Sequence, residues 1–81
     1  MMTWRLMYAR AVVSYLVALR YAGHELREEI RAIGKEAAPW IEDRPIPSRP
    51  NRYERLCRGH WVGYEVEQTD KTIRVVYVQS I

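Results

Sequence analysis

The chain has 81 residues, 48% of them hydrophobic and 28% charged, and its net charge is +3. This length suits one folded domain, residues 1–81, and excludes a multidomain or disordered protein. Cys57 is the only cysteine and no Cys/His cluster has zinc spacing, so we expect neither a metal nor a cofactor. The apolar run 11–19 is much shorter than the roughly 20 residues of a membrane span, so we expect a cytoplasmic protein without membrane contact.

The N-terminal segment predicts a strand followed by a helix. Residues 3–7 alternate, with Trp4 and Leu6 on one face, which favours a strand. Residues 9–21 then change to a helical period. The residues that carry this period are Val12, Leu16 and Leu19.

A second helix follows an interruption at residues 21–23, where Gly23 ends the first pattern. Apolar residues recur at steps of four, three and four: Leu26, Ile30, Ile33 and Ala37. Pro39 disfavours helical geometry in the residue before it, so this helix should end at or before Ala38.

Residues 38–51 contain all four prolines and predict an extended connector. It is too short to separate two domains. Trp40 and Ile41 are expected to pin its beginning onto the core.

The last third of the chain predicts three consecutive strands, at residues 52–57, 60–67 and 72–78. The middle strand alternates between an apolar face and a polar face. The last strand is nearly continuous in β-branched and aromatic residues, which places it inside the sheet, whereas the charges of the first strand place it at an edge. The predicted class is α+β, in the order β-α-α-β-β-β, with a helical hairpin packed on a small, mostly antiparallel sheet.

The register of the first hairpin has two solutions. A two-residue loop at Arg58-Gly59 places Arg52 and Glu54 on the face of Trp61. A three-residue loop beginning at Cys57 places Tyr53 and Arg55 there instead. The sequence leaves both open.

The segments Arg52-Tyr53-Glu54-Arg55-Leu56, Gly59 to Val66 and Thr72 to Val78, in this order of elements, resemble the RelE/ParE toxin superfamily. The resemblance implies a type II toxin that is neutralised by a cognate antitoxin. RelE-like members cut mRNA on the ribosome with a basic cluster on the open sheet face, whereas ParE-like members bind DNA gyrase. An inactive member that serves as a protein- or RNA-binding module is a further alternative, and a homodimer is also left open.

Two departures from the family pattern argue against catalysis. Trp61 stands where the resemblance expects an arginine, and no terminal Arg or Tyr follows Val78. Cleavage by a 2′-hydroxyl builds charge on the phosphate that preorganised cations must stabilise, and a neutral indole cannot do so. We therefore expect target binding rather than an endoribonuclease.

The candidate residues come from a basic segment, residues 44–58, which holds five arginines and the single acid Glu54. The arginines are Arg44, Arg49, Arg52, Arg55 and Arg58. Arginines of this kind favour bidentate contacts to phosphate or to an acidic protein. The predicted nucleic-acid or partner contacts are Arg49, Arg52, Arg55, Arg58 and Trp61. If the chain is an enzyme, the catalytic candidates are His60 and Arg55, although His60 alternates in phase with the apolar face and is more simply a core residue.

Gly63, inside the middle strand, indicates a bulge or the close approach of a large side chain.

Overall fold

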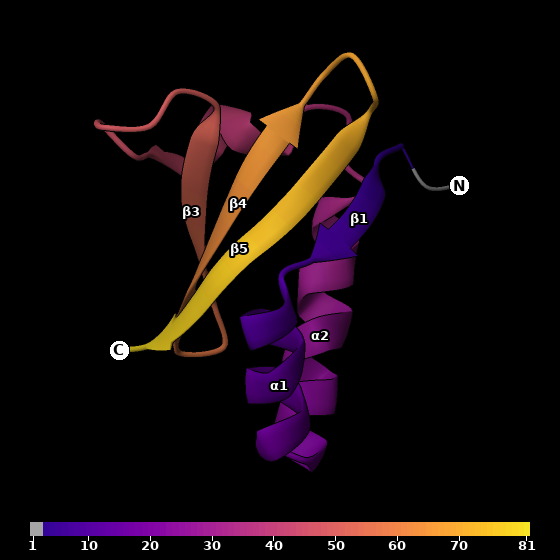
Figure 1. The fold of residues 1–81 in the computed structure, drawn as a ribbon, viewed down its shortest axis with the longest axis vertical. Helices are drawn as coiled ribbons and strands as arrows, with labels where there is room; N and C mark the ends of the chain where they lie inside the picture. Colours follow the sequence, from indigo (N-terminus) through magenta and orange to yellow (C-terminus); the bar gives the residue numbers. More distant parts are fainter. Residues whose placement is uncertain (1–2) are drawn as a thin grey trace.

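The structure is a computed structural model that describes residues 3–81. Its strands are β1 (Arg5–Tyr8), β2 (Arg44–Pro45), β3 (Arg52–Cys57), β4 (His60–Glu67) and β5 (Thr72–Ser80). Its helices are α1 (Arg10–Ala18), α2 (Tyr21–Ile33) and the short 3-10 helix η1 (Pro39–Glu42). The strands form one sheet in the order β1-β5-β4-β3-β2, and α1 and α2 lie together on one of its faces (Figure 1).

Only β1 and β5 pair in parallel, and the other neighbours are antiparallel. The predicted α+β class and the helical hairpin on a mostly antiparallel sheet are therefore confirmed. Strand β5 lies inside the sheet, as its β-branched run predicts, and it extends two residues beyond Val78. No helix within residues 3–81 has the length and apolarity to cross a membrane.

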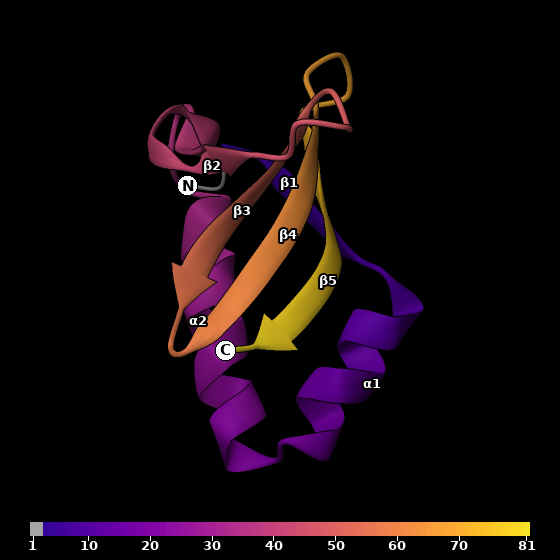
Figure 2. The same cartoon turned by 90° about the vertical axis from the view of Figure 1, so that its left-hand side faces the viewer.

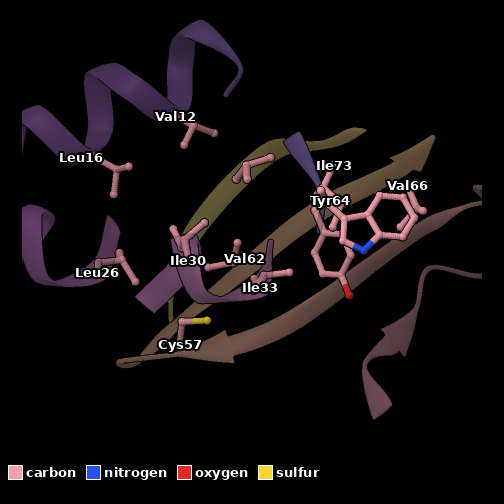
Figure 3. Close-up of a cluster of buried hydrophobic side chains, with 12 residues drawn as sticks. Val12, Leu16, Leu26, Ile30, Ile33, Cys57, Val62, Tyr64, Val66 and Ile73 are labelled. Atoms are coloured by element: carbon pink, nitrogen blue, oxygen red, sulfur yellow. The ribbon is translucent and has the colours of Figure 1, made fainter. Parts of the chain in front are cut away.

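The core lies between the two helices and the sheet face that they cover (Figure 3). Strand β4 contributes Val62, Tyr64 and Val66, the apolar set that its alternation predicts. The remaining hydrophobic core residues are Trp4, Val12, Leu16, Leu26, Ile30, Ile33, Cys57, Ile73 and Val75. Burial raises the pKa of the Cys57 thiol to about 11, so the cysteine is a small apolar core residue.

The predicted break between the helices was misplaced. Helix α1 ends at Ala18, and the chain reverses at Arg20, whose φ of 57° lies in the left-handed region. Gly23 lies inside α2 because the two helices approach closely there. A Cβ at Gly23 would lie 1.9 Å from the Leu16 carbonyl oxygen. The glycine therefore permits helix packing and does not end a helix.

The connector is more structured than the prolines predicted. It forms η1 and then β2, which lie at the end of the molecule opposite the α1–α2 turn (Figure 2). Trp40 packs against the core as expected, with its ring 5.4 Å from that of Trp4, but Ile41 is exposed. Because β2 pairs with β3, the prediction that β3 forms the sheet edge was wrong, although β2 covers only two of its residues.

The structure resolves the register of the β3–β4 hairpin. Cys57 pairs with His60 across the two-residue loop Arg58-Gly59, where both residues have positive φ. Arg52 and Glu54 consequently share a face with Trp61, as the first of the two registers required.

Candidate binding site on the open sheet face

The open face is defined here as the sheet face turned away from α1 and α2. The strand registers place a mixed set of side chains on it: Arg52, Glu54, Leu56, Trp61, Gly63, Glu65, Arg74, Tyr77 and Gln79. It is therefore the face on which the sequence expected target contacts.

Glu54 is the centre of a cluster on this face. Its side chain is 8% exposed and accepts hydrogen bonds from the Arg44 guanidinium and the Tyr77 hydroxyl. The Tyr77 hydrogen bond, together with the nearby Arg44 charge, outweighs burial and lowers the pKa of Glu54. Burial and the hydrogen bond to Glu54 raise the pKa of Tyr77 to about 12, so this hydroxyl remains protonated at neutral pH.

Arg44 also covers Trp61. Its guanidinium carbon lies 4.6 Å from the centroid of the Trp61 ring, a cation–π distance. Strand β2 delivers this arginine, because Arg44 pairs in register with Glu54. The position where the family resemblance expects an arginine thus holds an indole with an arginine from another strand above it. We call Arg44, Glu54, Trp61 and Tyr77 the open-face cluster.

Gly63 allows the Tyr77 ring to lie flat against the sheet within this cluster. A Cβ at Gly63 would come within 2.2 Å of that ring. The β4–β5 register also shifts between Gly63 and Tyr64. Both interpretations of this glycine, a bulge and a large neighbouring side chain, are therefore correct.

A polar groove of about 490 Å³ extends the open face toward the β4–β5 turn. Its lining combines Arg5 and Arg74 with the carboxylates of Glu65, Glu67 and Asp70. The mixture of charges makes this groove less suited to a polyanion than a uniformly basic one.

The predicted binding arginines do not form one patch. Arg52 lies on the open face and donates from Nε to Glu65 Oε2 at 3.2 Å. Arg58 lies at the tip of the β3–β4 hairpin and pairs with Glu25 of α2 at 3.1 Å. Arg49 is exposed in the loop between β2 and β3.

Arg55 lies on the opposite face, toward the helices. Its guanidinium donates to Asp43 at 2.9 Å, to Glu36 at 2.7 and 2.9 Å, and to the Pro39 carbonyl at 3.1 Å. These carboxylates, Glu36 first, raise the pKa of Arg55, and Asp43 in turn accepts from the Tyr64 hydroxyl. We call these four side chains, Arg55, Asp43, Glu36 and Tyr64, the connector clasp, because they fasten the connector to the sheet.

His60 also lies toward the helices, and both ring nitrogens are engaged. Nδ1 is 3.0 Å from the Arg58 carbonyl oxygen, which can only accept, so Nδ1 carries the proton. Nε2 is then the acceptor for the Tyr15 hydroxyl at 3.1 Å. The imidazole therefore offers no free lone pair to a substrate on the open face.

The two catalytic candidates do not lie with the open-face cluster. The open-face cluster combines an aromatic ring, an exposed guanidinium and a carboxylate, but His60 and Arg55 are on the other side of the sheet. No group of His, Cys, Asp and Glu side chains within the described part of the chain is arranged to hold a metal ion.

The sequence interpretation missed Arg44 and Tyr77 as site residues. Arg44 was counted only as part of the basic segment, because nothing local identifies a two-residue strand next to Pro45. The two-residue loop, however, places Glu54 on the face of Trp61. A carboxylate on that face indicates that a basic side chain of the same chain lies beside it.

Two solved structures share this fold over nearly the whole chain. The toxin RelE of E. coli, a double Arg→Ala mutant in the free state, aligns with a TM-score of 0.76 and 17% identity, over 98% of this chain and 84% of that chain. The archaeal RelE–RelB complex from Pyrococcus horikoshii aligns with a TM-score of 0.68 and 21% identity, over 98% of this chain and 96% of that chain. The sequence matches no family model and no curated protein. The chain thus has the fold of the RelE toxins, as the resemblance predicted.

Proposed function

We propose that this chain is the toxin component of a type II toxin–antitoxin pair, acting in the cytoplasm by binding a target in translation or DNA topology. The fold shared with the RelE toxins supports the toxin role. A cognate antitoxin is the proposed partner, by analogy with RelB in the archaeal complex.

The observation that favours binding over cleavage is the pairing of the open-face arginines. Arg44 and Arg52 already hold the carboxylates of Glu54 and Glu65. A phosphate in a cleavage transition state would have to displace these acids, at the cost of the charge stabilisation on which RNA cleavage depends. Exposed Arg44 and Arg49, with the partly buried Arg52 and with Trp61 beneath Arg44, instead form a recognition surface, and Arg58 remains a peripheral contact.

The toxin role is tested by inducible expression in a bacterial host. Growth should arrest when the chain is expressed alone and recover when the product of the neighbouring reading frame is co-expressed. A Trp61→Ala variant should lose toxicity while its melting temperature stays close to that of the parent. Harmless overexpression of the folded parent chain would contradict the proposal.

The mode of action is tested with purified protein. Ribosome-bound mRNA should remain uncut, while either translation in a cell-free system or supercoiling by gyrase should be inhibited. Arg55→Ala and His60→Ala variants serve as catalytic tests, with Arg44→Ala beside them. Site-specific cuts that disappear in these variants would establish an endoribonuclease and refute the binding mechanism.

A further inference from the structure

The two long edges of α2 carry opposite charges. Glu25 of α2 pairs with Arg58 of the sheet, and Glu36, just beyond the helix, pairs with Arg55. Glu28 lies 4.0 Å from Arg31, and both side chains are half exposed. Basic residues recur at steps of three and four along the other edge, at His24, Arg27 and Arg31, with Arg20 just before the helix and Lys35 just after it. All five are exposed.

Next to this basic edge lies an apolar ridge. Val13 and Val17 lie one turn apart on α1, and Tyr21 is the first residue of α2; the three are 44%, 70% and 73% exposed. They are three of the seven large hydrophobic side chains exposed in residues 3–81. A concentration of exposed apolar side chains on a helical hairpin is typical of a protein contact.

A groove of about 200 Å³ runs between the ridge and the basic edge. Leu16, Val13 and Val17 line its apolar side, and Arg20, His24 and Arg27 line the other. Figure 2 shows α1 and α2 spreading apart from the turn that joins them, and their close approach is at Gly23 and Leu16. The groove thus offers an apolar wall and a cationic wall to the same ligand.

Tyr8 and Arg27 also line a second groove of about 630 Å³, so the two grooves are adjacent. The second groove contains Arg5, Arg27, Arg31 and Lys71 against a single acid, Asp70. Arg27 and Lys71 lie over the rings of Tyr8 and Trp4, at 5.3 and 4.8 Å, rather than against carboxylates. We call the two grooves together the helical trough.

The charges of the trough therefore differ from those of the open face. Arg44 and Arg52 are bound to carboxylates, whereas neither Arg27 nor Lys71 forms a salt bridge within residues 3–81. Cations that contact only aromatic rings remain available to an acidic ligand.

We propose that the helical trough is the docking surface for an acidic, amphipathic segment of the antitoxin. Apolar side chains of that segment pack on Val13, Val17 and Tyr21, and its carboxylates meet Arg27, Arg31 and Lys71. RNA would use the cations but would leave the apolar ridge uncovered, so the ridge favours a protein ligand. The inference rests on the proposed function, because the partner that it names is the antitoxin.

The test measures binding of the neighbouring reading frame's product to the purified chain by isothermal titration calorimetry. Val17→Asp removes the apolar contact, and the double variant Arg27→Glu/Arg31→Glu reverses the charge. Each should weaken binding by at least about tenfold, as loss of an interface anchor does. The charge variant should also reduce the salt dependence of the affinity.

Matched controls carry the same chemical changes on the open face. Leu56→Asp and Arg74→Glu replace exposed residues there and should leave the affinity within about twofold of the parent, the range of near-neutral contacts. Thermal melts of all variants check that the fold is kept. Equal losses in the trough variants and the controls, with melting temperatures unchanged, would overturn the inference.

Binding of a labelled single-stranded RNA of 20 nucleotides tests the alternative that the trough binds nucleic acid. If Arg27→Glu/Arg31→Glu abolishes RNA binding while antitoxin binding survives, the trough is a nucleic-acid site and the inference is wrong. If the parent chain does not bind the product of the neighbouring reading frame, the proposed function itself fails. If the product binds the parent and both trough variants equally, only the trough assignment fails.

Discussion

The connector clasp and the open-face cluster each join an arginine to a carboxylate and a tyrosine, on opposite faces of the same sheet. Arg55 of the clasp is 23% exposed and makes contacts with two carboxylates and one carbonyl. Arg44 of the open-face cluster is 64% exposed and holds one carboxylate and the face of an indole. Burial and the number of acceptors thus separate an arginine that fixes the fold from one that is accessible to a target.

The two clusters are also linked along the chain. Asp43 turns toward Arg55 on the helix side, and the next residue, Arg44, turns toward Glu54 on the open face. The clasp therefore positions the connector from which the open-face arginine projects. We expect substitutions in the clasp to displace the open-face cluster, whereas substitutions in the open-face cluster should leave the clasp in place.

Replacing Arg55 should have the largest effect. Arg55→Ala leaves Asp43, whose side chain is 7% exposed, without its cation, and should lower the free energy of unfolding by about 3 kcal/mol. Arg55→Lys keeps the charge but loses the fork of donors and should be intermediate. Urea unfolding measures both, and a loss no larger than that of Arg44→Ala would contradict the distinction between the clusters.

Gly63→Ala should have the next largest effect on the free energy of unfolding. The new methyl group would overlap the Tyr77 ring, which must move away from Glu54, and we expect a loss of about 2 kcal/mol. Gly59→Ala is the control, because it meets no neighbouring atom and suffers only from its φ of 76°. Its cost should be about 1 kcal/mol. The reverse order of the two variants would show that Tyr77 is not packed against the strand.

The pKa of Glu54 provides a pH test of the open-face cluster. This pKa is lowered in the fold, so the ionised carboxylate stabilises the protein above the unfolded value near 4.5, and this contribution is lost as the pH falls through the folded pKa. Tyr77→Phe removes the largest cause and should cost about 1.5 kcal/mol near pH 7, the scale of a hydrogen bond to a charged group.

The difference in unfolding free energy between the parent and Tyr77→Phe should therefore shrink as the pH is lowered from 6 to 3. Tyr53→Phe, a tyrosine in the core-facing aromatic cluster, is the control, and its difference from the parent should not change with pH. If the difference in unfolding free energy between the parent and Tyr77→Phe does not change with pH, Tyr77 is not the main cause of the lowered Glu54 pKa.

Arg44→Ala should have the smallest effect on stability, below about 1 kcal/mol, because the Arg44 side chain is 64% exposed and Glu54 keeps its hydrogen bond from Tyr77. Arg44→Ala should change the fluorescence emission of Trp61, since the indole loses the guanidinium that lies over its ring. Intrinsic fluorescence measures this change, with Arg74→Ala as the matched control on the same face. A large loss of stability would place Arg44 with Arg55, as a residue that fixes the fold.

Several parts of the candidate site followed from local patterns. The alternation of β4 put Trp61 and Gly63 on the open face, and the two possible hairpin loops limited the neighbours of Trp61 to two sets. The failures came from long-range pairing. Arg55 and Arg52 are three residues apart in the sequence and are both typical contact residues, yet the register sends one to the clasp and the other to the open face.

The sequence by itself determined the order of the two helices and of β1, β3, β4 and β5, the apolar faces of α2 and β4, and the interior position of β5, because the periods of helix and strand are local properties of the chain. The tertiary structure alone decided which carboxylate each arginine pairs with. Pairing of Arg44 with Glu54 and of Arg55 with Glu36 joins residues ten and nineteen positions apart, across a strand and across layers. The position of Gly23 inside α2 depended in the same way on the approach of a second helix, which no local pattern records.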